Sequence, residues 1–418
     1  MFKSFLTKSE NIERESYIWN LIGSTLNAFQ SVIMLAVITR VTNLNDAGIF
    51  TIAYANSILM LNIGKYGMRN FQVSDYDSQF SFSEYKLSRL YTTLAMVSVS
   101  LIYILIISNL NDYSVTKSLT VLIMCVYKAI DSFEDVYHGL FQQENRLDIA
   151  GKALSIRMFC SIIIFSLSIF ISKSLLISLI ITTIASSIIF IYLTSIAYRE
   201  YKIEKKPILK NVILLLKICF PLFLSVFLSF YINNAPKYAI DSILNDELQA
   251  CYGFIVMPVF IIELLNGFIF NPVIYTLAKE WSKRNMHRFK AIIIKQIVII
   301  AIITLLCESA AYIAGIPLLS MLYSTDLNKY KTDLLILLLG GGFLVLSGLF
   351  NTVLTIMRKQ NKAVYIYAFI SLIALIFSSK IVRSYSLRGA SYLYLILMFL
   401  SSVLFIIFSI YFIKQSQK

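Results

Sequence analysis

The chain has 418 residues, of which 58% are hydrophobic and only 14% are charged, and its mean hydropathy is +0.75. This composition is typical of a polytopic membrane protein and excludes a soluble one. The formal net charge of +14 would suit a nucleic-acid-binding protein. The basic residues follow a membrane topology instead, so no nucleic acid partner is predicted.

Apolar stretches of membrane-spanning length recur along the whole chain. A helix of about 20 residues crosses a hydrocarbon core of roughly 30 Å. The first stretch lacks a small-residue cleavage site, so we predict that it is retained as a helix. The sequence predicts an all-α membrane protein with twelve spans, at residues 17–39, 47–66, 89–108, 117–138, 155–172, 175–197, 212–233, 249–272, 292–314, 333–357, 363–381 and 389–413.

The distribution of Lys and Arg predicts the topology. With the N-terminus inside, the inside segments hold 26 of these residues and the outside segments hold nine. Cytoplasmic loops of membrane proteins carry an excess of Lys and Arg. Both termini are therefore predicted to be cytoplasmic.

The polar connection YREYKIEKKPILK, at 198–210, divides the spans six and six. We therefore predict two six-helix lobes, 1–205 and 206–418, around a central cavity, as in many secondary transporters. All six prolines lie in the predicted second lobe. They predict bent helices in the second lobe, or else they mark only helix ends there.

The predicted fourth span contains a charged stretch, YKAIDSFEDVYHG at 127–139. At about 100° per residue, Lys128, Asp131 and Asp135 fall within an arc of roughly 60°, whereas Glu134 lies about 120° from Lys128. A charge within the bilayer costs roughly 2.5–3.5 kcal/mol, so these side chains line a polar cavity or form structural ion pairs. We predict a cavity role for Lys128 and Asp131, and we interpret Glu134 as part of a helix end that emerges into the cytoplasm.

The predicted seventh span ends in FYINNAPKYAID, where Asn233, Asn234 and Pro236 are predicted to break the helix. The two asparagines are candidate polar residues of the cavity lining. Lys237 is either a cationic group of the cavity or a surface lysine. Lys217, near the inner end of the same span, is a candidate for the cavity as well, although snorkelling to the lipid headgroups is the favoured interpretation.

Further polar residues lie deep in predicted spans. Glu263 is in the middle of the eighth span and Glu308 is in the outer part of the ninth. Buried carboxylates suit coupling to protons or sodium ions, so Glu263, Glu308 and Asp131 are candidate ion-coupling residues, with structural hydrogen bonding as the alternative. Asn20 and Asn27 share one face of the first span and are candidate cavity-lining residues.

Motifs for catalysis and metal binding are missing from the sequence. The chain has only two histidines and five cysteines, and it has no nucleophile-elbow, Walker or HExxH motif. The cysteines lie in or beside spans, without metal-type or disulfide spacing. The sequence predicts neither an enzyme nor a metal or cofactor site.

Several segments carry a family resemblance. TRVTNLNDAGIFTIAYA at 39–55 is similar to the R-x-L-G-x-x-x-F-G pattern of polysaccharide flippases in the multidrug/oligosaccharidyl-lipid/polysaccharide (MOP) superfamily, with Arg40 and Gly48 matching and Asn43 in place of the middle glycine. The resemblance covers essentially the whole chain. The segments that most resemble Wzx-type flippases of capsule and O-antigen clusters are GMRNFQVSD at 67–75, YKAIDSFEDVYHGLFQQENRLDIAGKALSIR at 127–157 and NNAPKYAIDSIL at 233–244.

The resemblance implies a protein that moves undecaprenyl-diphosphate-linked oligosaccharide across the bacterial cytoplasmic membrane by alternating access, coupled to a proton or sodium gradient. Arg40, Lys128 and Lys237 would be basic residues of its cavity. Its partners would be the lipid-linked oligosaccharide, membrane lipid, and the polymerase and glycosyltransferases of the same pathway.

Two other functions remain open. A small-molecule antiporter of the related drug/cation (MATE) group would favour acidic residues in its cavity. A membrane-embedded polysaccharide polymerase or ligase would be expected to carry a long outside loop with catalytic residues, and the predicted outside connections are short.

Overall fold

The computed structural model of the chain describes residues 2–75, 79–199, 201 and 206–415, and every regular element within them is a helix. The chain forms two compact units, Met1–Phe227 (unit 1) and Leu228–Lys418 (unit 2). This division falls within helix α9, whereas the predicted lobe boundary precedes α9 and borders residues 202–205, which lie outside the described part.

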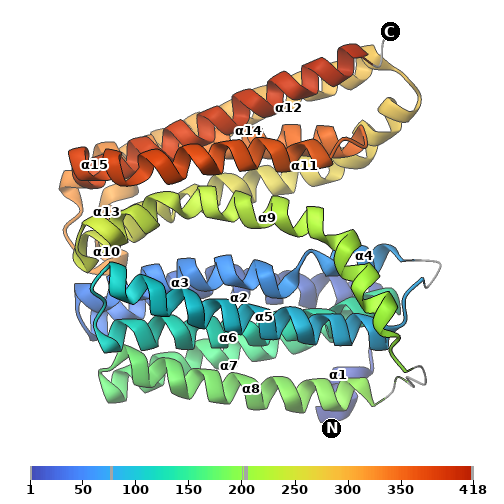
Figure 1. The fold of residues 1–418 in the computed structure, drawn as a ribbon, viewed down its shortest axis with the longest axis horizontal. Helices are drawn as coiled ribbons and strands as arrows, with labels where there is room; N and C mark the ends of the chain where they lie inside the picture. The colour runs from blue at the N-terminus through green and yellow to red at the C-terminus, as the bar shows by residue number, and fades with distance from the viewer. Residues whose placement is uncertain (1, 76–78, 200, 202–205, 416–418) are drawn as a thin grey trace. The chain divides into compact units, whose positions relative to one another are not determined.

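The described residues of unit 1 form eight complete helices and the first part of a ninth. Figure 1 labels them in chain order. They are α1 (Phe2–Thr7), α2 (Ile12–Val41), α3 (Leu44–Lys65), α4 (Met68–Ser74), α5 (Phe82–Leu110), α6 (Val115–Gln143), α7 (Leu147–Ser172), α8 (Leu175–Tyr198) and α9 (Leu209–Ile243).

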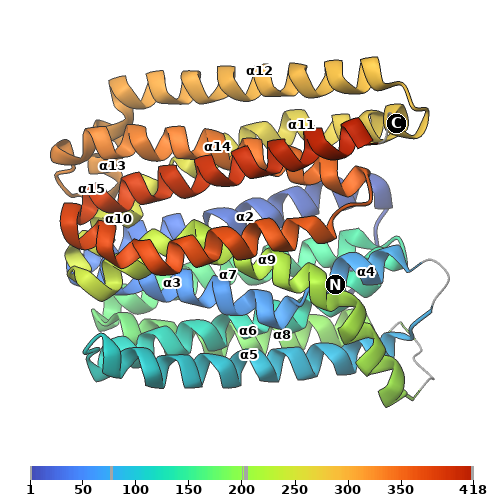
Figure 2. The same cartoon turned by 45° about the horizontal axis from the view of Figure 1, so that its top comes forward.

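Unit 2 contains the rest of α9 and the helices that follow it (Figure 2). They are α10 (Asp246–Val256), α11 (Val259–Ser282), α12 (Met286–Ala310), a π-helical turn (Ala311–Gly315), α13 (Ile316–Tyr323), a 3-10 turn (Asn328–Tyr330), α14 (Lys331–Ile356) and α15 (Asn361–Gln415).

The number of spans agrees with the prediction. Ten segments among the described residues are long and apolar enough to cross a membrane. One of them, α15, has 55 residues and contains Ser386 with φ 53° and ψ −139°, so it consists of two helices joined at a kink. Helix α6 has 29 residues, or about 43 Å, and is long enough to span although its charges lower its hydropathy. With α6 and the second half of α15, the described part of the chain contains twelve spans.

The predicted helix break at Asn233, Asn234 and Pro236 is wrong. Helix α9 continues through these residues and ends at Ile243. Proline removes one backbone donor, which costs less than exposing a whole unpaired turn to hydrocarbon. Other helical segments of unit 2 are interrupted. One interruption is at Pro258, between α10 and α11, and another is the π-helical turn just before Pro317, between α12 and α13.

Helix α6 is at the centre of unit 1. It packs against α3, α4, α5, α7 and α8. Nineteen of its 29 residues are buried, including Lys128, Asp131, Glu134 and Asp135. Because polar groups within a bilayer need partners inside the protein, the charged stretch of α6 requires neighbouring helices that carry opposite charges. The structure supplies them from α4, α5 and α7.

Helices α2 and α7 lie against each other along much of their length, and small residues allow this contact. A Cβ atom added at Gly151 would lie 2.6 Å from the backbone nitrogen of Asn20 and 2.7 Å from the carbonyl carbon of Trp19. Ser155, one turn further on, donates a hydrogen bond to the carbonyl oxygen of Trp19 at 3.1 Å. The backbones therefore touch at a position that only glycine allows.

Replacing Gly151 by alanine is expected to lower the free energy of unfolding by roughly 1–3 kcal/mol, because the added methyl group clashes with backbone atoms that cannot rotate away. Gly267→Ala is the matched control, since the nearest atom to its added Cβ, the side-chain nitrogen of Asn271, is 3.9 Å away. Thermal unfolding of both purified variants in detergent measures the difference. Equal melting temperatures would contradict the close α2–α7 packing.

Candidate functional site

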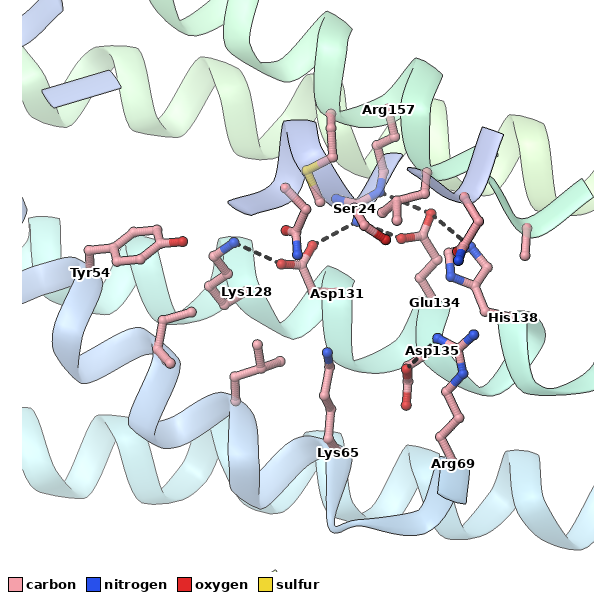
Figure 3. A pocket seen from close by; sticks show the side chains of 17 residues that line it. Ser24, Tyr54, Lys65, Arg69, Lys128, Asp131, Glu134, Asp135, His138 and Arg157 are labelled. Atoms are coloured by element: carbon pink, nitrogen blue, oxygen red, sulfur yellow. Dashed lines mark hydrogen bonds and ion pairs between the residues drawn. The ribbon is translucent and has the colours of Figure 1, made fainter. Parts of the chain in front are cut away.

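A polar cavity of about 230 Å³ lies inside unit 1, between α2, α3, α4, α6 and α7. Figure 3 shows that charged side chains from several of these helices point toward one another there. The charged cluster of this cavity consists of Lys65, Arg69, Lys128, Asp131, Glu134, Asp135, His138 and Arg157.

Lys128 is held on one side of the cavity by both charge and hydrogen bonds. Its ammonium nitrogen lies 2.8 Å from Asp131 Oδ2 and donates to Gln30 Oε1 at 2.9 Å. Gln30 in turn donates to the hydroxyl of Tyr127. The ammonium also lies 5.3 Å from the centroid of the Tyr54 ring. Lys128 is therefore both a member of a structural ion pair and part of the cavity wall.

Arg157, on α7, joins two carboxylates of α6. Its guanidinium donates to Asp131 Oδ1 at 2.7 Å, to both carboxylate oxygens of Glu134 at 3.0 and 2.5 Å, and to Ser186 Oγ at 3.2 Å. The Arg157 side chain is fully buried. His138 Nε2 lies 3.7 Å from the same Glu134. A planar guanidinium suits this two-carboxylate bridge because its donors point in fixed directions.

The structure corrects the interpretation of Glu134. Its side chain is only 4% exposed and is paired with Arg157, so it does not emerge into solvent. The helical period correctly predicts that Glu134 and Lys128 lie on different sides of α6. Neighbouring helices, however, cover α6 on more than one side. Asp131 lies between Lys128 and Glu134 around α6, about 60° from each. Asp131 and Glu134 therefore both face α7, where Arg157 lies, and both line the cavity.

Asp135 connects α6 to α4 and α5. Its oxygens accept from Arg69 Nη1 at 3.3 Å and from Arg89 Nη2 at 2.9 Å. Arg89 is fully buried and also donates to the carbonyl oxygen of Gly64 at 2.7 Å. This carbonyl belongs to the last turn of α3, directly before the left-handed residues Tyr66 and Gly67 that separate α3 from α4. The buried arginine thus stabilises a helix end at the cavity.

Lys65 is the cation of the cluster that no described carboxylate holds in a close ion pair, although its charge acts on Asp131 and Asp135 from a greater distance. It is half-buried at the end of α3, and it makes no hydrogen bond or ion pair with the described residues. If Arg89 is added to the cluster, it contains five Lys and Arg side chains and three carboxylates. The site therefore carries an excess of positive charge even when His138 is neutral. Such a site favours an anion, which Lys65 can contact without first losing an ion pair.

Four of the predicted site residues come together in this cavity: Asn20, Asn27, Lys128 and Asp131 all line it. Arg40 does not, because it is exposed in the last turn of α2. The structure adds Lys65, Arg69, Glu134, Asp135, His138 and Arg157 to the set of candidate site residues.

The remaining candidates lie on α9, α11 and α12. Lys217 is exposed on the unit 1 part of α9. Asn233, Asn234 and Lys237 are half-buried on the unit 2 part of α9. Glu263 is exposed on α11 and Glu308 is half-buried on α12, and neither carboxylate has an ion pair among the described residues. Their predicted roles in transport stay predictions.

The twelve spans in the described part of the chain, with a polar, cationic cavity among helices, define a polytopic membrane protein whose fold is the one found in transporters of the MOP superfamily. The chain is similar to an inward-facing multidrug-resistance MATE-family transporter of that superfamily, with a TM-score of 0.68 and 13% identity over 95% of this chain and 98% of the other. It is also similar to a MOP-superfamily transporter from Pyrococcus furiosus, with a TM-score of 0.57 and 15% identity over 100% of this chain and 98% of the other. The binding pocket of that transporter has reverse polarity, which suggests a different function for it.

Residues 14–276 match the family described as polysaccharide biosynthesis protein, and the chain belongs to this family. A relative, the capsular polysaccharide biosynthesis protein CapF of Staphylococcus aureus, is 22% identical over 90% of this chain and 94% of its own length. The family match confirms the polysaccharide part of the predicted resemblance, and the shared fold agrees with its MOP-superfamily part. The family thus links the chain to polysaccharide biosynthesis, and the solved structures show that its fold is one that transporters have.

Proposed function

We propose that this protein flips undecaprenyl-diphosphate-linked oligosaccharide repeat units across the bacterial cytoplasmic membrane for the synthesis of a surface polysaccharide, such as capsule or O-antigen. The observation that carries the proposal is the excess of cations in the unit 1 cavity of a chain from the polysaccharide biosynthesis family. A diphosphate carries negative charge that lysine and arginine side chains bind well.

The neutral residues of the cavity suit the glycan. Asn20, Ser24, Asn27 and Tyr54 provide amide and hydroxyl groups beside the charged cluster. Such groups donate and accept hydrogen bonds, as sugar hydroxyls do, without adding charge. The polyprenyl tail would remain in the bilayer, so the cavity needs to hold only the headgroup and the first sugars.

The direction of transport follows from the proposed topology, in which both termini are cytoplasmic. The charged cluster then lies in the cytoplasmic half of unit 1, since its residues come from the C-terminal end of α3, from α4, from the middle and C-terminal part of α6 and from the N-terminal half of α7. The substrate is made on that side of the membrane, so a cationic site there could load it. Alternating access between two lobes would then release it outside.

A drug antiporter is the second candidate because the solved structures that share the fold include MATE transporters. The charge of the cavity favours the flippase. Each carboxylate of the cluster is already paired with a buried arginine or lysine, which leaves no free acidic group in this cavity for a cationic drug.

We further propose that transport is coupled to protons or sodium ions through Glu263. Asp131 accepts hydrogen bonds from both Lys128 and Arg157, whereas Glu263 has no ion pair among the described residues and can exchange an ion more easily. Glu263→Gln is expected to flatten the pH or sodium dependence of transport, measured in vesicles with imposed gradients. Glu308→Gln is the matched comparison, and an unchanged dependence in Glu263→Gln would exclude Glu263 from coupling.

Deletion of the gene, followed by leaflet-resolved analysis of lipid-linked oligosaccharides, tests the proposed function. Accumulation of these lipids in the inner leaflet is the expected result. Display of single repeat units outside would indicate a polymerase, and an unchanged distribution would contradict both. A functional link to the polymerase and glycosyltransferases of the same pathway is part of this proposal, because they would consume and supply the flipped lipid.

A further inference from the structure

A second cavity lies at one end of unit 2. It has a volume of about 260 Å³ and is lined by Trp281, Met357, Lys359, Phe412 and Gln415. These residues come from the last turn of α11, the end of α14 with the connection that follows it, and the end of α15. In Figures 1 and 2 the C-terminal end of α15 lies beside the connection between α11 and α12.

The cavity combines one cation with an aromatic and apolar wall. The Lys359 ammonium lies 5.4 Å from the centroid of the Phe412 ring, and it has no ion pair among the described residues. Trp281 is half-buried and packs on Phe289, with 5.1 Å between the ring centroids. Tryptophan rings at helix ends characteristically lie at the level of lipid headgroups. The exposed Lys359 thus lies beside an aromatic and apolar surface that acyl chains can contact.

The surroundings of this cavity are strongly basic. Glu280 is the only carboxylate in the three segments that flank the lining residues, and it is 7% exposed and 3.8 Å from Arg288. The segments 279–290, 358–362 and 408–415 contain nine basic residues: Lys279, Lys283, Arg284, Arg288, Lys290, Arg358, Lys359, Lys362 and Lys414. One carboxylate cannot neutralise nine cations, so this end of unit 2 attracts anions.

We propose that this cavity binds the head group of an anionic phospholipid of the surrounding membrane. Lys359 would contact the phosphate, the amide of Gln415 would donate a hydrogen bond, and Trp281, Met357 and Phe412 would contact the upper acyl chain. Basic pockets between membrane helices at the cytoplasmic face recognise such head groups. A cytoplasmic location of these loops would by itself explain why they are basic. It would not explain why an aromatic cavity lies next to Lys359. The site is independent of the substrate cavity in unit 1.

The two tryptophans of the chain make a direct test possible, since Trp19 lies in unit 1 and Trp281 lines the proposed site. In a Trp19→Phe background, Trp281 is the only tryptophan. The full-length protein is reconstituted with lipids that carry bromine on the upper acyl chain, either phosphatidylglycerol or phosphatidylcholine. Brominated phosphatidylglycerol is expected to quench Trp281 fluorescence more strongly at equal mole fraction.

Lys359→Ala in the same background is expected to reduce the relative binding constant for phosphatidylglycerol over phosphatidylcholine about fivefold. Lys331→Ala is the matched control, because Lys331 also lies over an aromatic ring, that of Tyr312 at 3.7 Å, but at the opposite end of α14. The control should keep the full preference for the anionic lipid.

Three results would overturn the proposal. The first is equal quenching by the two brominated lipids. The second is a preference for phosphatidylglycerol that survives Lys359→Ala or is lost equally in Lys331→Ala. The third is loss of the preference when inorganic phosphate is added at constant ionic strength, which would identify a site for the free anion instead of a lipid.

Discussion

Replacing Arg157 by methionine is expected to destabilise unit 1 more than the loss of any exposed ion pair. Arg157 is the partner of both Asp131 and Glu134, and without it Glu134 keeps only His138, at 3.7 Å. Breaking a buried ion pair by removing one partner costs about 3–5 kcal/mol, because the remaining charge is buried without compensation. The melting temperature in detergent should fall by roughly 6–10 °C, at about 2 °C per kcal/mol.

A matched control and a rescue separate this effect from a general loss of charge. Arg288→Met removes an arginine that is 68% exposed and lies 3.8 Å from Glu280, so it should change stability by less than about 1 kcal/mol. Adding Glu134→Gln to Arg157→Met removes the carboxylate that has lost its arginine partner, whereas Asp131 keeps Lys128, and should restore part of the lost stability. If Arg157→Met melted at the wild-type temperature, the buried charge network described for unit 1 would be wrong.

Replacing Lys65 by glutamine is expected to impair transport while leaving the fold intact. Lys65 lines the cavity and has no hydrogen bond or ion pair with the described residues, so its charge is available to a substrate. A hydrogen bond to a charged group contributes about 1.5–3 kcal/mol, which corresponds to a loss of roughly 10- to 100-fold in transport efficiency. Asp131 and Asp135, whose charges Lys65 stabilises from a distance, keep their close ion pairs with Lys128, Arg157 and Arg89, so the melting temperature should change little.

Lys173→Gln is the control for Lys65→Gln. Both lysines lie at helix C-termini of unit 1, but Lys173 is exposed, lies over the ring of Phe170, 4.6 Å from its centroid, and does not line the cavity. Lys65→Arg, which keeps the charge, should retain most of the transport. Normal surface polysaccharide and normal flipping rates in Lys65→Gln would exclude this lysine from substrate binding.

The spans were predictable because the length of an apolar stretch is a strong constraint in a bilayer. The same reasoning shows why the charged stretch of α6 needs a polar environment, and the helical period correctly placed Lys128 and Asp131 on one face. Periodicity describes one helix at a time. It could not show that a second face of α6, with Glu134, is covered by Arg157 of α7.

Arg89 and Arg157 were not predicted as site residues, because hydropathy shows where an apolar stretch begins and not where the helix that contains it begins. The third and fifth spans were predicted from residues 89 and 155, whereas α5 begins at Phe82 and α7 at Leu147. Arg89 and Arg157 therefore fell at predicted span ends and were counted with the cytoplasmic segments. Their carboxylate partners are 46 and 26 residues away at Asp135 and Asp131. A useful signal would have been the surplus of carboxylates in α6, which requires basic partners within the bilayer.

Lys65 was counted with the cytoplasmic residues although it lies near the end of the predicted span 47–66. The helix α3 ends at Lys65, and the chain turns at Tyr66 and Gly67, both with positive φ, before α4 continues as part of the same apolar segment. Only this local geometry places a lysine at a helix end inside the cavity. The continuation of α9 through Pro236 was also not predictable from local preference, because the bilayer penalises an unpaired turn more than a single missing donor.

The central claim is that the purified protein alone moves a diphosphate-linked oligosaccharide across a bilayer. The direct measurement uses proteoliposomes that contain a polyprenyl-diphosphate oligosaccharide with a fluorophore on the sugar, to which a membrane-impermeant quencher is added outside. Vesicles with wild-type protein should lose nearly all of the fluorescence, and vesicles with Lys65→Gln should lose the inner-leaflet half much more slowly. In protein-free vesicles quenching should stop at the outer-leaflet half. If quenching also stopped there with wild-type protein, even under an imposed proton or sodium gradient, the account would be contradicted.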